Sequence, residues 1–253
     1  MIKNIFKGIK AYSGTFKLIS KLGLWKYFGI PIAISIVTAT LILVSAYGLS
    51  DNIGAYISSF WTWDWGKDTF GFISEILSGL IIIVIGFMVY KHIVMALSAP
   101  FMSPVSEKIE AYLTGVENHL HRNTSFKDQL WRGIRINVRN LAMELLLTIP
   151  ILILSFIPII NIFTTFILFL VQSFYAGFGN MDYTLERHFK YSESIDFVKQ
   201  NKGVAIGNGI VFMLFLLIPV VGIILVLPLS VTAATTETVK LLADKKKISL
   251  NEG

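Results

Sequence analysis

Apolar residues occur in four long runs, separated by segments that hold most of the charge. The first run, 28–50, is uncharged. As an α-helix its roughly 23 residues extend about 35 Å, enough to cross a hydrocarbon core with some tilt. The second run, 76–100, predicts another spanning helix. Lys91 and His92 lie near its end, where we expect their side chains to extend toward the lipid headgroups. The first half of the chain therefore predicts two transmembrane helices.

The third and fourth runs, 141–178 and 204–234, are each interrupted by an Ile-Pro pair, at Pro158 and at Pro219. Proline removes a backbone donor and clashes with the preceding turn, so a helix should break there. Each arm of the fourth run has only about 15 residues, or about 22 Å, which is short for a full crossing. The pattern predicts two re-entrant helical hairpins whose freed backbone groups are buried against protein. Two ordinary kinked helical pairs are the alternative.

Two amphipathic helices are predicted between the second and third runs. Ser103 and Pro104 suit the N-cap and first position of one helix, and Gly115 suits its end. One face of this helix is apolar and the other is charged: the apolar positions are Val105, Ile109 and Leu113, and the charged ones are Glu107, Lys108 and Glu110. The other helix covers 125–140 and carries arginines at helical spacing: Arg132, Arg135 and Arg139. These arginines indicate either a helix lying on anionic lipid or a vestibule that attracts anions.

Charge is distributed unevenly around the runs. The segment before the first run is rich in lysine, from Lys3 to Lys26, whereas the loop after it is mainly acidic and carries the interfacial aromatics Trp61, Trp63 and Trp65. The positive-inside rule therefore places the N-terminus in the cytoplasm. Because the segments flanking the third and fourth runs are also basic, each hairpin should enter and leave on that side.

The composition supports an integral membrane protein: 54% of the residues are apolar and 15% are charged, against about 25% charged in soluble domains. The mean hydropathy is +0.68. In so apolar a chain, the net charge of +6 indicates a membrane surface rather than nucleic acid. We expect one all-α membrane domain, divided into a basic N-terminal segment (1–27), two transmembrane helices (28–100), amphipathic cytoplasmic helices (101–140), two hairpins (141–240) and a basic tail (241–253).

Residues for catalysis or cofactor binding are not apparent. The chain has no cysteine, and its four histidines lack metal-binding spacing. Glu144 is the single ionisable residue in the central apolar runs and lies near an end, so no proton relay is apparent. We therefore expect neither an enzyme nor a bound metal, but passive conduction in which helix N-termini help desolvate an anion. Gly203, Gly207 and Gly209 indicate close helix packing.

A series of short stretches resembles, in order, the CysZ family of sulfate permeases, which shares a superfamily with etoposide-induced membrane proteins. These stretches are Gly23-Leu24-Trp25-Lys26, Ala99-Pro100-Phe101, Leu113-Thr114-Gly115, Ile157-Pro158, Asp182-Tyr183, Gly209, Ile218-Pro219 and 228–234. The resemblance implies sulfate entry across a bacterial inner membrane for cysteine synthesis, through a homo-oligomer. It also implies two long helices with shorter, partly penetrating hairpins.

The resemblance further implies a sulfate site just before the first long helix, where the family has a Gly-hydrophobic-Arg-Arg stretch. Trp25 and Lys26 occupy the positions of the two arginines, so the point charge is kept without the bidentate fork. The candidate substrate-binding residues are Gly23, Leu24, Trp25 and Lys26, with Arg132 and Arg135 raising the local anion concentration. Alternatively, Trp25 and Lys26 anchor the chain at the interface, and the protein is a non-transporting factor in envelope or lipid organisation.

Overall fold

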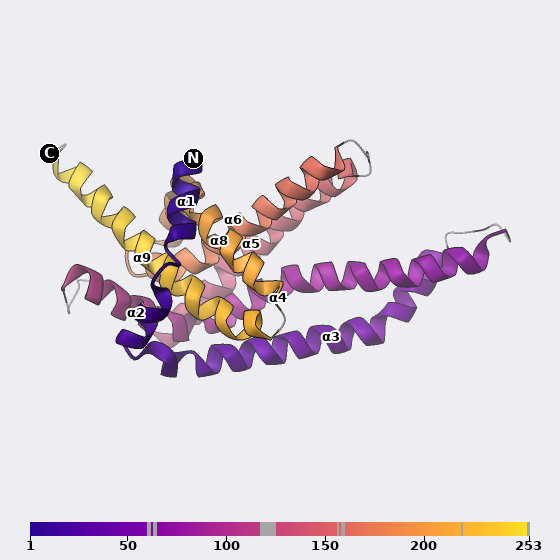
Figure 1. The fold of residues 1–253 in the computed structure, drawn as a ribbon, viewed down its shortest axis with the longest axis horizontal. Coiled ribbons are helices and arrows are strands. Elements are labelled where there is room, and N and C mark those ends of the chain that lie inside the picture. The colour runs from indigo at the N-terminus through magenta and orange to yellow at the C-terminus, as the bar shows by residue number, and fades with distance from the viewer. Residues whose placement is uncertain are drawn as a thin grey trace.

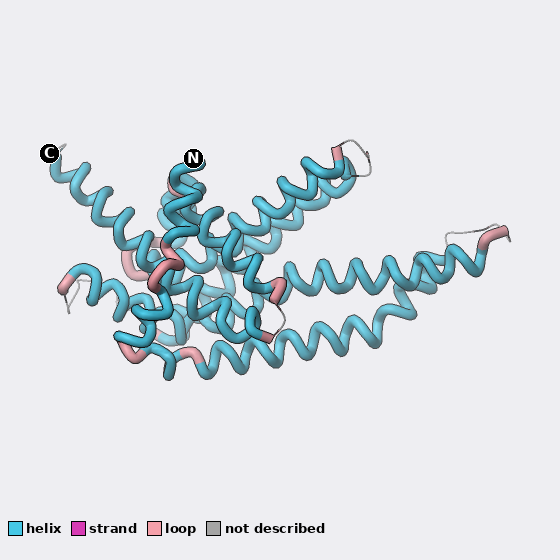
Figure 2. Tube along the Cα trace, in the orientation of Figure 1, coloured by secondary structure: helices cyan, strands magenta, loops and turns pink. Residues whose placement is uncertain are grey.

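The computed structural model describes residues 1–59, 62, 65–116, 125–155, 157, 160–218 and 220–251. Within these ranges the elements are helices joined by short connections, and no strand is present, which confirms the all-α prediction (Figures 1 and 2). Four residues named above lie outside the described residues: Trp61, Trp63, Pro158 and Pro219. So do two of the four histidines, His119 and His121. The elements in chain order are α1 (Ile2–Lys10), α2 (Thr15–Lys21), the 3-10 helix η1 (Leu24–Tyr27), α3 (Gly29–Ser58), α4 (Lys67–Thr114), α5 (Phe126–Ser155), α6 (Asn161–Leu185), α7 (Tyr191–Gln200), α8 (Lys202–Leu216) and α9 (Val221–Asn251).

Five of the described helices contain a segment long and apolar enough to cross a membrane. These segments are Gly29–Leu49, Ile85–Thr114, Phe126–Ser155, Asn161–Leu185 and Ile224–Lys245. Helix α8 is apolar but has only 15 residues. At 1.5 Å per residue it extends about 22 Å, less than the roughly 30 Å of a hydrocarbon core.

Helices α3 and α4 form a long hairpin that projects away from the rest of the molecule (Figure 1). α4 continues through Pro100 and Pro104, so the predicted new helix beginning at Ser103 is wrong. The Ser103 hydroxyl donates to Glu186 instead of capping a helix. Burial of α4 on both sides of the prolines offsets the missing backbone donors, because its inward-facing residues belong to the core: Val94, Met95, Ala99, Met102, Val105 and Ile109. Gly115 ends the helix in the left-handed conformation, as predicted.

The two proline-interrupted runs form the α5–α6 and α8–α9 hairpins. Their helices stop at Ser155 and at Leu216, so both breaks fall where they were predicted. Beside the second break, Val220 has a φ of +63°, a strained conformation for a β-branched residue. By contrast, the expected boundary at 140 is absent, because α5 is continuous from Phe126 through Pro150.

The N-terminal segment packs into the bundle. A Cβ added to Gly207 of α8 would lie 2.0 Å from the backbone oxygen of Ile5 in α1, so only glycine permits this approach. A Cβ added to Gly209 would lie 1.7 Å from the backbone oxygen of Ser173 in α6. The predicted role of these glycines in close packing is confirmed. Tyr12 then ties the segment to the core, because its hydroxyl donates to the backbone oxygen of Asn208 at 2.9 Å.

Candidate functional site

Three side chains from α4 and α5 form a charged cluster inside the bundle. Lys91 Nζ lies 2.7 Å from Glu144 Oε1, and His92 Nε2 lies 2.9 Å from Glu144 Oε2. Lys91 and Glu144 are fully buried and His92 is 3% exposed. The expectation that Lys91 and His92 reach toward the headgroups is therefore wrong. Glu144, beside which the sequence showed no ionisable group, has both of them as partners. Glu144 draws both bases inward because a buried charge is costly unless it is paired.

The hydrogen bonds around His92 indicate which of its ring nitrogens carry protons. Asn137 Nδ2 donates to the backbone oxygen of Gly133 at 2.9 Å, so Asn137 Oδ1 is the acceptor that faces His92 Nδ1 at 3.3 Å. Nδ1 therefore carries a proton. A further proton must lie between His92 Nε2 and Glu144 Oε2, since two bare lone pairs would repel each other. The cluster thus sets two basic side chains, Lys91 and His92, against a single carboxylate.

Helix α5 presents additional polar groups beside this cluster. Asn137, Asn140, Glu144 and Thr148 follow the spacing of one helix face, and all four are buried. Asn140 Nδ2 and Thr148 Oγ1 have no hydrogen-bond partner among the described residues. A buried donor without a partner costs free energy. The face of α5 that holds Glu144 therefore has unused hydrogen-bonding capacity that a ligand could satisfy.

A second cluster surrounds Arg132. Its Nε and Nη2 donate to the two carboxylate oxygens of Asp182 on α6, at 3.1 and 2.9 Å. The same guanidinium donates to the backbone oxygen of Phe189 at 2.8 Å and to Ser194 Oγ at 2.6 Å. The Arg132 side chain is only 13% exposed. Arg132 thus does not lie on a lipid surface, and Asp182 compensates its charge.

A third cluster joins α4 to the end of α6. Glu110 Oε2 lies 3.0 Å from Arg187 Nη2, and Glu110 Oε1 lies 2.7 Å from His188 Nε2. Glu110 was expected on the charged outer face of its helix, but it is buried because the segment just after α6 supplies these two partners. Glu186 lies beside this cluster, just beyond the apolar segment of α6. Burial, opposed by a hydrogen bond from Ser103, raises the pKa of the Glu186 carboxyl to about 7.

The first and third clusters lie on α4. The second lies on α5 and α6, whose neighbouring residues Gly133 and Tyr183 lie against α4 between those two clusters, at Ala99 and Met95. We call this succession the polar track. It begins at Lys91, passes the Arg132–Asp182 pair and ends at Glu110. The hydrogen bond from the Tyr183 hydroxyl to the backbone oxygen of Met95 (2.6 Å) links α6 to α4 between the first cluster and the last. Nineteen residues of α-helix extend about 29 Å, close to the thickness of a hydrocarbon core. The polar track is therefore long enough to line a route through a membrane.

The other predicted site residues lie elsewhere, in or beside η1. Leu24 is fully buried in the core, and the Gly23 N–H donates to the backbone oxygen of Ser20. Trp25 Nε1 donates to Ser20 Oγ at 3.1 Å. These contacts fix η1 in place. Lys26 is exposed, and its Nζ lies 5.5 Å from the centre of the Tyr27 ring.

Arg135 is exposed, and its guanidinium lies 4.0 Å from the centre of the Tyr191 ring. The structure therefore places Arg132 in the polar track, while no hydrogen bond or ion pair among the described residues joins Lys26 to either arginine. The residues missed from the sequence are Lys91, His92 and Glu144. One signal could have revealed them: a lone acid in an apolar run needs a basic partner, and Lys91 and His92 were available.

Metal coordination finds no support among the described residues, where no group of three or more His, Asp or Glu side chains could hold an ion. The side chains of the polar track are instead paired with one another. This arrangement suits the passage or binding of a charged solute more than metal chemistry.

Five described helices are long and apolar enough to cross a membrane, and ion pairs are buried among them, which is typical of a multi-pass membrane protein of the transporter or channel class. The chain belongs to the family described as "Sulfate transporter CysZ/Etoposide-induced protein 2.4", whose model matches residues 11–226. The resemblance noted in the sequence is thereby confirmed. The family description names a transporter, in agreement with the expectation that the chain is not an enzyme.

Curated relatives agree with the family assignment. The chain is 27% identical over 232 residues to "Sulfate transporter CysZ" of Pseudomonas fluorescens strain Pf0-1, which covers 87% of each chain. It is 27% identical over 225 residues to the protein of the same name from Pseudomonas paraeruginosa, covering 87% of this chain and 89% of the relative. The Pseudomonas syringae pv. tomato protein of that name is 26% identical over 225 residues, covering 87% and 86%.

Proposed function

We propose that the protein is a permease or channel that passes sulfate or a related oxyanion across a bacterial inner membrane into the cytoplasm, where it supplies cysteine synthesis. The observation that carries this proposal is the buried Lys91–His92–Glu144 cluster, in which two basic side chains face one carboxylate. Ionisable groups at such depth are costly and mark ion or substrate pathways in membrane proteins. The names of the relatives support sulfate as the substrate class.

The anion first meets exposed positive charge and then buried charge. Lys26, beside Gly23, Leu24 and Trp25, attracts it at one surface, and Arg135 adds to the potential near the polar track. Inside, the anion competes with Glu144 for Lys91 Nζ. The unpartnered Asn140 Nδ2 and Thr148 Oγ1 replace part of its hydration. Arg132 stays paired with Asp182 and contributes to the positive potential without a direct contact.

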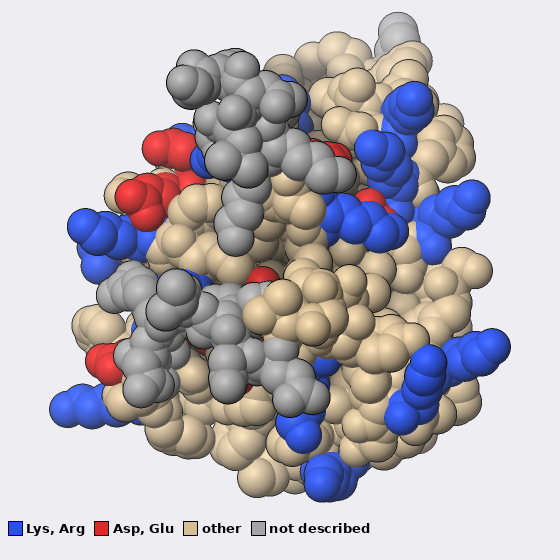
Figure 3. Space-filling view, turned by 90° about the vertical axis from the view of Figure 1, so that its left-hand side faces the viewer, with Lys and Arg blue, Asp and Glu red and all other residues tan. Residues whose placement is uncertain are grey.

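The proposed orientation follows from the distribution of charge. Figure 3 views the end of the molecule opposite the tip of the α3–α4 hairpin, and Lys and Arg are spread widely over this face. We place this end, with the N-terminus, in the cytoplasm. The α5–α6 and α8–α9 hairpins then re-enter from that side, and their exposed apolar tips contact lipid or a second subunit. These tips include Ile157, Ile160, Leu217, Ile218 and Val220. A homo-oligomer would cover part of this apolar surface.

Radiolabelled sulfate uptake into proteoliposomes tests the proposal, with the natural chain compared with Lys26→Ala and with Lys17→Ala. Lys17 is also an exposed lysine of the N-terminal segment, but it lies outside the proposed entry site, so it serves as the matched control. We expect saturable uptake that falls several-fold in Lys26→Ala and is unchanged in Lys17→Ala.

The same assay separates the alternatives. Uptake that is equal in both variants would keep the transporter and remove Lys26 from the entry site. Absence of uptake of sulfate, sulfite and chloride above empty liposomes would contradict transport. It would favour a non-transporting role in envelope or lipid organisation.

A further inference from the structure

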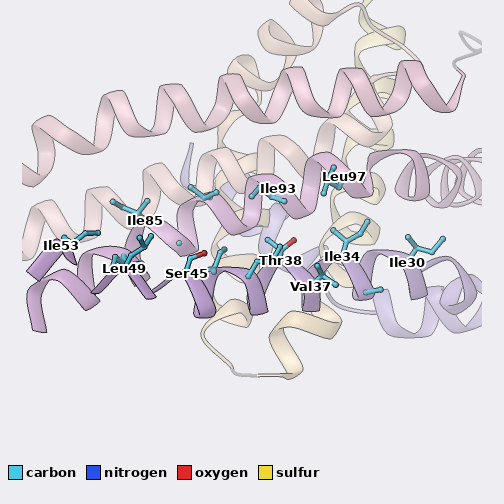
Figure 4. A pocket seen from close by; sticks show the side chains of 16 residues that line it. Ile30, Ile34, Val37, Thr38, Ser45, Leu49, Ile53, Ile85, Ile93 and Leu97 are labelled. Atoms are coloured by element: carbon cyan, nitrogen blue, oxygen red, sulfur yellow. The ribbon is translucent and has the colours of Figure 1, made fainter. Parts of the chain in front are cut away.

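An apolar groove runs along the α3–α4 hairpin (Figure 4). Its volume is about 700 Å³, and it extends from Ile30 and Leu97 at one end to Leu49 and Ile53 at the other. Most of its lining is Ile, Leu, Val and Ala, so it excludes a hydrated ion. From Ile30 to Ile53 the helix rises about 35 Å, long enough for an extended acyl chain. The shape and lining of the groove therefore suit the apolar tail of a lipid.

Three exposed lysines gather beyond the Ile30 end of the groove, in the region of η1. Lys108 Nζ lies 5.1 Å and Lys26 Nζ 5.5 Å from the centre of the same ring, that of Tyr27. Lys21 Nζ donates to the Tyr112 hydroxyl at 2.7 Å. None of these lysines takes part in an ion pair with a carboxylate among the described residues. We call Lys21, Lys26 and Lys108 the basic cluster.

The Tyr27 hydroxyl shows that the basic cluster acts as a local positive field. A hydrogen bond from Lys108, reinforced by the charges of Lys108 and Lys26, lowers the pKa of the Tyr27 hydroxyl. Lys21 contacts Tyr112 through its ring and a hydrogen bond, and Lys108 contacts the ring of Tyr27. A phosphate at this point would meet two or three positive charges without displacing a carboxylate.

The basic cluster and the groove are continuous along the chain. Tyr27 ends η1, α3 begins at Gly29, and Ile30 already lines the groove. On the other helix, Leu97 lines the groove, and Lys108 follows 11 residues later, about 16 Å along α4. A molecule with an anionic head and a long apolar tail would thus find both halves of its binding site in one line.

We infer that the groove and the basic cluster together bind one anionic phospholipid, with its phosphate at Lys108, Lys21 and Lys26 and an acyl chain along α3 and α4. The site goes beyond the proposed transport of a small oxyanion. Sulfate and lipid phosphate share tetrahedral oxyanion chemistry, but only the lipid uses the groove. Because Lys26 also belongs to the proposed entry site for the anion, the test leaves it unchanged.

Binding of phosphatidylglycerol to the full chain in neutral detergent, measured by native mass spectrometry, tests this inference. Phosphatidylcholine with the same acyl chains and inorganic phosphate are the comparison probes. We expect the affinity for phosphatidylglycerol to fall roughly 30-fold in the double variant Lys21→Ala, Lys108→Ala, since each lysine near an anionic lipid contributes about fivefold. The matched control Lys10→Ala, Lys17→Ala should bind as the natural chain does.

A second variant tests the groove. Ala33→Phe fills it near the basic cluster and should weaken phosphatidylglycerol binding while leaving binding of inorganic phosphate unchanged. Equal binding of phosphatidylcholine, or a double variant that binds normally, would overturn the inference. So would a groove occupied by a second copy of the chain, seen as a dimer that excludes lipid. Sulfate uptake that persists in the double variant, together with lost lipid binding, would show that the two sites are separate.

Discussion

The two proline-broken hairpins have similar sequence patterns but are held in the bundle by different interactions. The α5–α6 hairpin carries Glu144, Arg132 and Asp182, which form buried ion pairs with α4 or within the hairpin. The α8–α9 hairpin has no ionisable residue from 203 to 236. It is joined to α6 by an amide hydrogen bond in which Asn180 Nδ2 donates to Asn208 Oδ1 at 2.9 Å. Within the hairpin, Asn208 Nδ2 donates to the Ser230 backbone oxygen of α9 at 3.0 Å.

The two hairpins also differ in how much of their apolar surface is buried. The end of α5 and the start of α6 expose large apolar side chains, such as Ile153 at 63% and Ile162 at 76%. Most of α8 and the middle of α9 are buried, because glycines let α8 approach neighbouring backbones closely. Hydropathy alone does not separate the two cases. Small residues decide which apolar run packs against protein, and buried charges decide which one lines the polar track.

Substitution in the buried charged cluster of the α5–α6 hairpin should cause the largest loss of unfolding free energy. Glu144→Ala leaves Lys91 and His92 buried without their partner, which should cost about 3–5 kcal/mol of unfolding free energy. Asn208→Ala in the other hairpin removes only neutral hydrogen bonds and should cost about 1–3 kcal/mol. Unfolding by SDS titration from a mild detergent measures both. Equal losses would contradict the difference between the hairpins.

Substitution of a closely packed glycine in the α8–α9 hairpin should cause the next largest loss of unfolding free energy. Gly209→Ala places a methyl group against the Ser173 backbone oxygen and should cost about 3 kcal/mol. Gly48→Ala in α3 is the matched control, because a Cβ there meets nothing within 4 Å. The control should be neutral or stabilise by up to about 1 kcal/mol. Thermal unfolding of the two variants checks this, and similar midpoints would show that α8 does not need the glycine.

A dependence on pH should belong to the α5–α6 hairpin. The pKa of Glu186 is raised from 4.5 to about 7, so the protonated carboxyl favours the folded chain. The contribution of Glu186 to the free energy of unfolding is complete below about pH 4.5 and is lost as the pH rises through about 7. Its size is at most about 3 kcal/mol. Glu186→Gln should keep the contribution at pH 8. The difference in unfolding free energy between variant and natural chain, measured from pH 4.5 to 8, should grow with pH; a constant difference would place the carboxyl in an ordinary environment.

Substitution at the exposed tip of the same hairpin should change the unfolding free energy least. Leu152 on α5 is 44% exposed, so Leu152→Ala should change the unfolding free energy in detergent by less than about 0.5 kcal/mol. Thermal unfolding of the purified variant provides the measurement. A loss of about 2 kcal/mol or more would indicate that the tip is packed against protein.

Local signals in the sequence predicted much of the fold. The apolar runs, the breaks near Pro158 and Pro219, the helix end at Gly115 and the close-packing glycines depend on nearby residues or on residue size. The continuity of α4 through Pro100 could not be predicted, because burial against other helices overrides the local cost of proline. The Lys91–Glu144 pair was missed because it joins residues 53 positions apart. Likewise, Glu110 is buried only through Arg187 and His188 of a distant segment.

The most direct test of the proposed function replaces the central cluster with apolar residues of similar volume: Lys91→Met, His92→Leu and Glu144→Met together. Replacement of a buried ion cluster in this way is often neutral or stabilising. We therefore predict that the triple variant folds at least as stably as the natural chain but shows no sulfate uptake into proteoliposomes above empty vesicles. Uptake at the natural rate by the folded triple variant would contradict an anion pathway through Lys91, His92 and Glu144.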